Sequence, residues 1–121
     1  MSLFGSHEKE DMSGSIHITG DATVKTDDNI ASNCGGDGAG IGSGEKGEMS
    51  GTIVIDGNAQ VEVSSNDRGA GIGTGDDGNL SGNIMIGGNA QVSATGAEGS
   101  AGIGTGDDGN FTGSITMDGN A

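Results

Sequence analysis

Apolar and polar residues alternate in short runs along most of the chain. From Leu80 to Ile86 every second position is apolar or glycine, and Ala90, Val92 and Ala94 form a second run of the same kind. A period of two is typical of a β-strand that buries one face. Glycine, asparagine and aspartate separate the runs, and these residue types tolerate the positive φ of tight corners. The pattern therefore predicts short β-strands joined by corners.

The strand pattern recurs with a fixed spacing. The segment AGIG occurs three times, 31 residues apart, at 39–42, 70–73 and 101–104. The pattern Ser/Thr-Gly-x-Ile follows with the same spacing, at 50–53, 81–84 and 112–115. An earlier copy begins at Ser13, 37 residues before Ser50, so it carries an insertion of six residues around Cys34. The chain is thus a repeat protein of about three and a half copies.

Each copy contains three alternating runs, which predict three short strands. Copies that align without gaps place each strand in parallel beside its equivalent in the next copy, about 4.8 Å away. The inside columns would be Ile16/Ile53/Ile84/Ile115, Ile18/Ile55/Ile86/Met117, Ala22/Ala59/Ala90/Ala121, Val24/Val61/Val92 and Ile41/Ile72/Ile103. We therefore expect an all-β fold, a right-handed parallel β-helix (β-solenoid) with about 31 residues per coil, because parallel crossovers are nearly always right-handed. Tandem antiparallel hairpins are the alternative, but the chain lacks their favoured two-residue Asn-Gly turn.

The glycine-rich segments resemble a known family. Gly38–Gly44 (GAGIGSG) and Gly69–Gly75 (GAGIGTG), each followed by Ser-Gly-x-Ile-x-Ile, resemble the repeats of bacterial secreted and cell-surface proteins. The resemblance covers residues 38–121 and is looser before Gly38. It implies a right-handed parallel β-helix and, for some members, binding of calcium and polysaccharide. The chain then divides into a tag-like or flexible N-terminal segment, 1–12, and a β-solenoid, 13–121.

Composition and charge narrow the classes of partner. Glycine supplies 28 of the 121 residues, and proline, Trp and Tyr are absent, which excludes collagen and a long helix. The net charge of −14 argues against nucleic acid and anionic membranes, since both need a basic surface. The first residues have neither the basic nor the apolar region of a signal peptide, so a secreted or cell-surface location rests on the resemblance. Cys34 is the single cysteine, so the chain has no internal disulfide.

The strongest candidate for chemistry is the acidic corner, which we define as Asp76, Asp77, Asp107 and Asp108. These residues form two Asp-Asp-Gly-Asn segments one copy apart, and stacked carboxylates repel each other. Calcium would relieve the repulsion because it takes several carboxylate and carbonyl oxygens as ligands. The corner is thus the expected metal site, with Lys46 of the preceding copy expected to pair with Asp77. The alternative is a solvated charged edge that favours solubility.

These observations favour a non-catalytic module, structural or polysaccharide-binding, with calcium as its candidate cofactor. A polysaccharide lyase or hydrolase is the alternative by fold analogy alone, with Arg68 as the lone cation near a corner. Ice binding is a minor alternative, because a regular solenoid can present hydroxyl columns such as Ser43/Thr74/Thr105. Open strand edges at the two ends predict that the chain associates end to end as a homo-oligomer, or that it is a fragment of a longer array.

Overall fold

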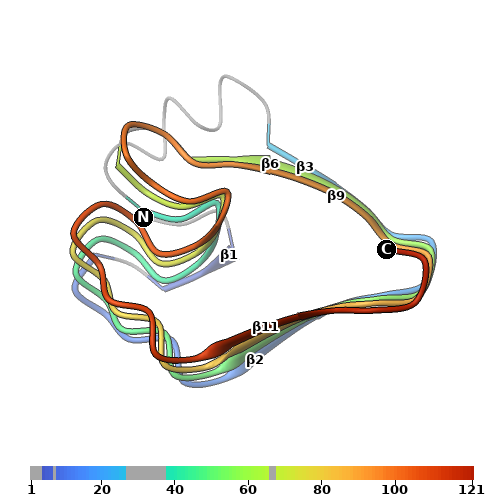
Figure 1. Ribbon diagram of the computed structural model, residues 1–121, viewed down its shortest axis with the longest axis horizontal. Helices are drawn as coiled ribbons and strands as arrows, with labels where there is room; N and C mark the ends of the chain where they lie inside the picture. The colour runs from blue at the N-terminus through green and yellow to red at the C-terminus, as the bar shows by residue number, and fades with distance from the viewer. Residues whose placement is uncertain (1–3, 7, 27–37, 66–67) are drawn as a thin grey trace.

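The chain forms an all-β structure in the computed structural model, which describes residues 4–6, 8–26, 38–65 and 68–121. Three sheets of short parallel strands make up the fold (Figure 1). The first sheet contains, in spatial order, β2 (Ser15–Ile18), β5 (Thr52–Ile55), β8 (Asn83–Ile86) and β11 (Ser114–Met117). The second contains β3 (Thr23–Lys25), β6 (Gln60–Ser64) and β9 (Gln91–Thr95). The third contains β1 (Phe4–Gly5), β4 (Ile41–Gly42), β7 (Ile72–Gly73) and β10 (Ile103–Gly104).

Each strand pairs in parallel with its equivalent one copy away. Ile84 of β8 faces Ile53 of β5 on one side and Ile115 of β11 on the other, and Val61 of β6 faces Val92 of β9. Figure 1 shows the result as successive copies lying almost on top of one another. The expected parallel pairing and its register are confirmed, and the architecture is solenoid-like. Within the described residues there is no helix long and apolar enough to cross a membrane.

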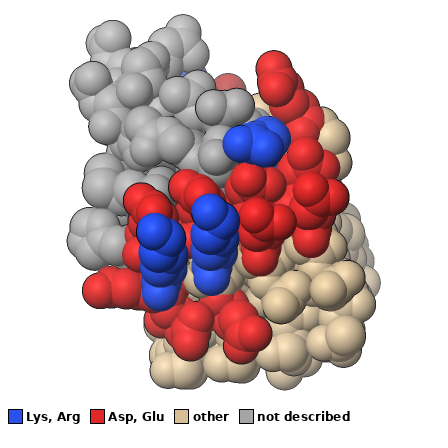
Figure 2. Space-filling model, turned by 90° about the vertical axis from the view of Figure 1, so that its left-hand side faces the viewer, with Lys and Arg blue, Asp and Glu red and all other residues tan. Residues whose placement is uncertain are grey.

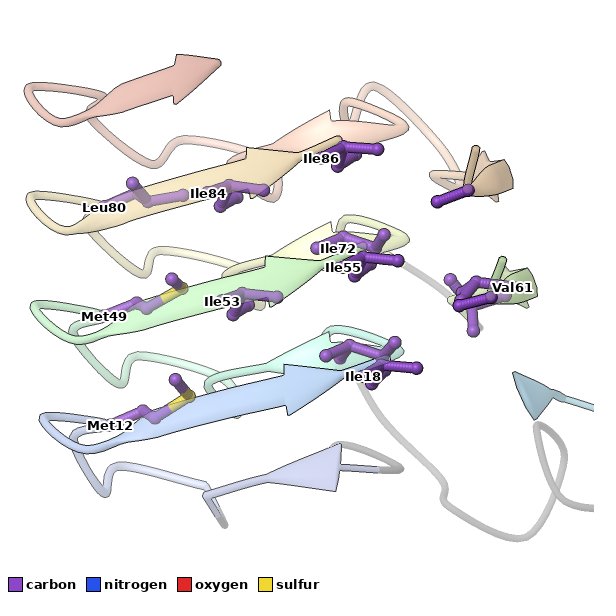
Figure 3. Packing of buried hydrophobic residues seen from close by; sticks show 14 residues of the cluster. Met12, Ile18, Met49, Ile53, Ile55, Val61, Ile72, Leu80, Ile84 and Ile86 are labelled. Atoms are coloured by element: carbon purple, nitrogen blue, oxygen red, sulfur yellow. The ribbon is translucent and has the colours of Figure 1, made fainter. Parts of the chain in front are cut away.

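The core consists of the columns of aliphatic side chains between the sheets (Figure 3). The central members are fully buried, and they are Ile41, Ile53, Ile55, Ile72 and Ile84. A further column, which the period-two analysis did not single out, contains Met12, Met49, Leu80 and Phe111, joined by isolated parallel bridges. Because like side chains stack on like, one packing solution is repeated at each level of the fold.

Glycine allows the copies to stack closely at one recurring position. Gly73 has a φ of +136°, and its equivalent Gly104 has a φ of +142°, a region that favours glycine. A Cβ built on Gly73 would overlap the carbonyl oxygen of Gly104 in the next copy. The last position of the AGIG segment therefore requires glycine for two reasons: the positive φ, and the absence of a Cβ that would overlap the next copy.

The described part of the N-terminal segment 1–12 lies in register with the copy above it. β1 pairs with β4, and the backbone N–H groups of Lys9 and Met12 donate to the carbonyl oxygens of Glu45 and Glu48 at 2.7 and 2.8 Å. The stacked structure therefore begins before Ser13, whereas the sequence suggested a tag-like or flexible segment. The insertion around Cys34 lies outside the described residues.

Candidate functional site

The acidic corner follows the strands of the third sheet. After β7, the Thr74 hydroxyl turns inward and donates to the carbonyl oxygen of Gly78 at 3.0 Å, which closes the loop between them. Within this loop Asp77 has a φ of +55°, and the equivalent Asp108 has the same value. Aspartate is one of the few non-glycine residues that enter this region readily. The glycine-rich sequence and the buried hydroxyl thus shape a tight loop that carries two adjacent carboxylates in each of the last two copies.

The structure gives the four carboxylates different surroundings. Asp76 is only 4% exposed, and its Oδ2 lies 3.5 Å from Nη1 of Arg68. Asp77 and Asp108 are exposed, and Asp107 is half-buried. The backbone N–H of Asp77 donates to the carbonyl oxygen of Asp107 at 2.8 Å, so the two loops are stacked directly. The expected stacking is thus present, while Arg68 is an ion-pair partner of Asp76 rather than a lone cation.

This arrangement restricts which carboxylates of the acidic corner could hold a metal ion. In the part of the chain that the structure describes, no group of three or more His, Cys, Asp or Glu side chains is placed to hold a metal ion. Arg68 already supplies a positive charge beside Asp76, so the carboxylates open to an added cation are those of Asp77, Asp107 and Asp108. Calcium binding at the acidic corner stays a prediction.

The first two copies carry a different charge pattern at the same corner. Lys9 and Lys46 occupy the position that Asp77 and Asp108 occupy later, with φ values of 61° and 59°. Lys46 pairs with Glu45 of its own loop at 3.2 Å, where Asp77 was the expected partner. The pKa of Lys46 is raised mainly by its hydrogen bond to Glu45. The negative charge of Asp77 raises it further. Figure 2 shows this edge, where two elongated basic side chains (blue) lie beside a group of acidic side chains (red).

A second candidate surface runs along the outside of the β3-β6-β9 sheet. Thr23, Gln60 and Gln91 form one exposed row, and Lys25, Glu62 and Ser93 form the next. Lys25 Nζ lies 4.0 Å from Glu62 Oε2, so this pair joins two successive copies. A hollow of about 270 Å³ is lined by residues of both rows and by the core-facing Val24, Val61 and Val92 between them. The outer face of the sheet therefore presents amide, hydroxyl and charged side chains on three neighbouring strands.

Amide side chains form a ladder at the corner that follows the first sheet. Each Nδ2 group donates to the Oδ1 atom of the preceding copy at 3.0–3.2 Å, along Asp21, Asn58, Asn89 and Asn120. The side chains of this ladder are exposed. These bonds hold successive copies in register, which is a structural role.

A histidine–carboxylate pair lies on the outer face of the first sheet. His17 Nε2 is 3.0 Å from Asp56 Oδ1, and both side chains are partly exposed. Hydrogen bonds with Thr19, the larger cause, and with His17 lower the pKa of Asp56. The pair therefore joins two successive copies at the surface.

The hydroxyl column considered for ice binding faces the interior. Ser43 and Thr74 are fully buried, and their hydroxyls donate to the carbonyl oxygens of Gly47 and Gly78. These groups close loops and cannot present a flat hydroxyl surface to ice. The sequence did not reveal that these hydroxyls point inward. The alternation of residues separates the two faces of a strand, but it does not show which polar side chain can form a hydrogen bond inside the fold.

Comparisons with protein-family models, with curated proteins and with solved structures find no match for this chain. The function is therefore argued from the geometry of the two candidate surfaces, the acidic corner and the polar rows of the β3-β6-β9 sheet.

Proposed function

We propose that the protein is a right-handed parallel β-solenoid with about 31 residues per coil, and that it acts as a non-catalytic polysaccharide-binding module of a secreted or cell-surface protein. The observation that carries the proposal is the exposed row of Thr23, Gln60 and Gln91 on the β3-β6-β9 sheet. It places an uncharged hydrogen-bonding side chain on each of three neighbouring strands, at the interstrand spacing of about 4.8 Å.

A repeated surface suits a polymer better than a small substrate. Side-chain amides such as those of Gln60 and Gln91 both donate and accept hydrogen bonds, which matches the hydroxyl groups of sugars. A ligand that itself repeats can make the same contact on several strands, so weak single contacts add through multivalency. A unique catalytic centre would instead require one copy to differ sharply from the others at the same surface.

Charge and composition restrict the ligand further. The chain has no Trp or Tyr on which a sugar ring could stack, so hydrogen bonds must supply most of the affinity. An acidic polysaccharide would be repelled by a protein of net charge −14 unless a divalent cation bridged the two. We therefore expect binding of neutral polysaccharides without calcium, and of acidic ones only with it.

The test is affinity electrophoresis of the folded chain through gels that contain neutral or acidic polysaccharides, with millimolar calcium or with chelator. The double variant Gln60→Ala/Gln91→Ala should weaken binding about tenfold, since each lost neutral hydrogen bond costs about 0.5–1.5 kcal/mol. The matched control is Asn83→Ala, a similar amide truncation on the outer face of the first sheet. The proposal fails if no polysaccharide retards the chain, and the assigned surface is wrong if the control weakens binding as much as the double variant.

A further inference from the structure

A hollow on the outer face of the first sheet lies where one column of side chains is interrupted. The residues that follow β2, β5, β8 and β11 form a column through the corner, which contains Thr19, Asp56, Gly87 and Asp118. Because Gly87 has no side chain, a hollow of about 210 Å³ remains between Asp56 and Asp118. Val54 and Met85 also line this hollow, and Met85 is 45% exposed. The hollow, which we call the Gly87 notch, therefore combines apolar side chains with carboxylates.

An earlier copy shows what a carboxylate at this position binds. The backbone N–H groups of Asp56 and Asp118 donate to the preceding copy at 3.0 Å in each case, so the two aspartates are held in the same way. The Asp56 carboxylate accepts a hydrogen bond from Nε2 of His17, 3.0 Å away in the preceding copy. Thr19 of that copy donates a second hydrogen bond to it. A nitrogen donor is thus already bound by the aspartate of one copy.

The Asp118 carboxylate also turns toward the preceding copy. A Cβ built on Gly87 would overlap Oδ1 of Asp118, so this carboxylate lies over the glycine. The register places Met85 and Gly87 beneath Asp118, where His17 and Thr19 lie beneath Asp56. Neither Met85 nor Gly87 has a side-chain donor, and among the described residues no hydrogen bond or ion pair reaches the Asp118 carboxylate. The place of the histidine ring is therefore open in this copy.

We propose that the Gly87 notch binds an alkylammonium group, with Asp118 as its counter-ion. The ammonium takes the place beside Asp118 that the His17 ring takes beside Asp56. A carboxylate only accepts hydrogen bonds, so the ligand must donate, and a cationic donor forms the stronger, charge-assisted bond. Met85 and Val54 cover the carbon stem of the ligand, because a methionine side chain adapts its shape to apolar groups.

The charge of the protein favours a cation over an anion at this place. With a net charge of −14 the chain attracts cations and repels anionic ligands. A calcium ion is the competing occupant, but it requires several oxygen ligands and gains nothing from Met85 and Val54. Because the notch is open to water and offers one free carboxylate, we expect a dissociation constant in the millimolar range for a single amine. The site lies on a different sheet from the proposed polysaccharide surface and does not depend on it.

The test is an NMR titration of the folded chain with butylammonium chloride at constant ionic strength. The backbone N–H signals of Met85, Gly87 and Gly88 should shift and reach saturation. 1-Butanol, which has the same carbon stem without the charge, should produce no saturable shift. Nα-acetyl-lysinamide presents the same cationic group on a peptide: tighter binding than butylammonium would assign a lysine side chain as the source of the ligand, and equal or weaker binding would assign a free amine.

Two variants and a matched control locate the contact. Asp118→Asn should raise the dissociation constant about tenfold, since a hydrogen bond to a charged acceptor becomes one to a neutral acceptor. Gly87→Ala should also weaken binding, because the added Cβ displaces the Asp118 carboxylate while the backbone at Gly87 needs no positive φ. Asp21→Asn is the control, as it makes the same acid-to-amide change at an exposed position where later copies already carry asparagine. It should leave the dissociation constant unchanged.

Three results would overturn the proposal. The first is the absence of a saturable shift at the Gly87 notch with butylammonium. The second is equally tight binding of 1-butanol, which would reduce the notch to an apolar patch. The third is an equal effect of Asp118→Asn and Asp21→Asn, which would show only a response to the overall charge of the protein. None of these results alters the expected retardation of the chain by polysaccharides, so the two proposals fail separately.

Discussion

Substitution of equivalent glycines by alanine isolates the close contact between copies. Gly14 and Gly82 occupy the same place in the repeat, and neither requires a positive φ. A Cβ on Gly82 would overlap the carbonyl oxygen of Gly51, which accepts the N–H of Asn83 at 3.0 Å, whereas a Cβ on Gly14 has nothing within 4 Å. The two substitutions are chemically identical and differ only in whether a copy lies beneath them.

The expected magnitudes have opposite signs. Gly82→Ala should lower the free energy of unfolding by about 3 kcal/mol, because overpacking costs about 1–3 kcal/mol and a strained ladder hydrogen bond about 1 kcal/mol more. Gly14→Ala should raise it by about 0.5 kcal/mol, since alanine reduces the entropy of the unfolded chain.

Urea unfolding measures both effects. The midpoint should fall by about 1.5 M for Gly82→Ala at an m-value of about 2 kcal/mol/M, and should rise slightly for Gly14→Ala. Equal midpoints for the two variants would refute the reasoning, because they would show that the copies are not in backbone contact at this position. Unchanged m-values would confirm that the comparison concerns the same folded state.

Three further outcomes follow from the packing and the charges. Ile84→Asp should unfold the chain, because it places a charge in the core. Met85→Asp lies on the outer face and should shift the thermal midpoint, measured by circular dichroism, by no more than a few degrees. Equal effects of the two substitutions would contradict the period-two assignment. Because hydrogen bonds with Thr19 and His17 lower the pKa of Asp56 below 3.8, its contribution to stability is present above that pH and is lost as the pH falls through the lower folded value. The stability difference between wild type and Asp56→Asn should therefore shrink between neutral pH and pH about 2 in urea titrations, and a constant difference would exclude the pair as its source. Calcium at ten times its dissociation constant should stabilise the chain by about 1.4 kcal/mol and raise its melting temperature by about 5 °C, whereas an unchanged temperature would leave the acidic corner as a solvated edge.

Periodicity in the sequence carried most of the information on the fold. The fixed spacing of the AGIG segments and the alternation around Ile84 predicted parallel strands, their register and the buried columns, because these features depend on local geometry repeated in each copy. The Lys25–Glu62 pair needs only this register, because the two residues are equivalent positions of successive copies. It identified the acidic corner as a stack of carboxylates, since equivalent residues of successive copies must lie side by side.

Tertiary structure decided which residues from different places meet. The pairing of Arg68 with Asp76 occurs in one copy, so no repeat encodes it. The inward turn of the Thr74 hydroxyl recurs at Ser43, but it depends on the backbone carbonyl that each hydroxyl meets inside the fold. The stacking of β1 on β4 also escaped the sequence analysis, because Phe4 differs in kind from the Ile41 that it faces. Parallel pairing uses backbone groups that every residue shares, so a rung can continue after the side-chain pattern has diverged.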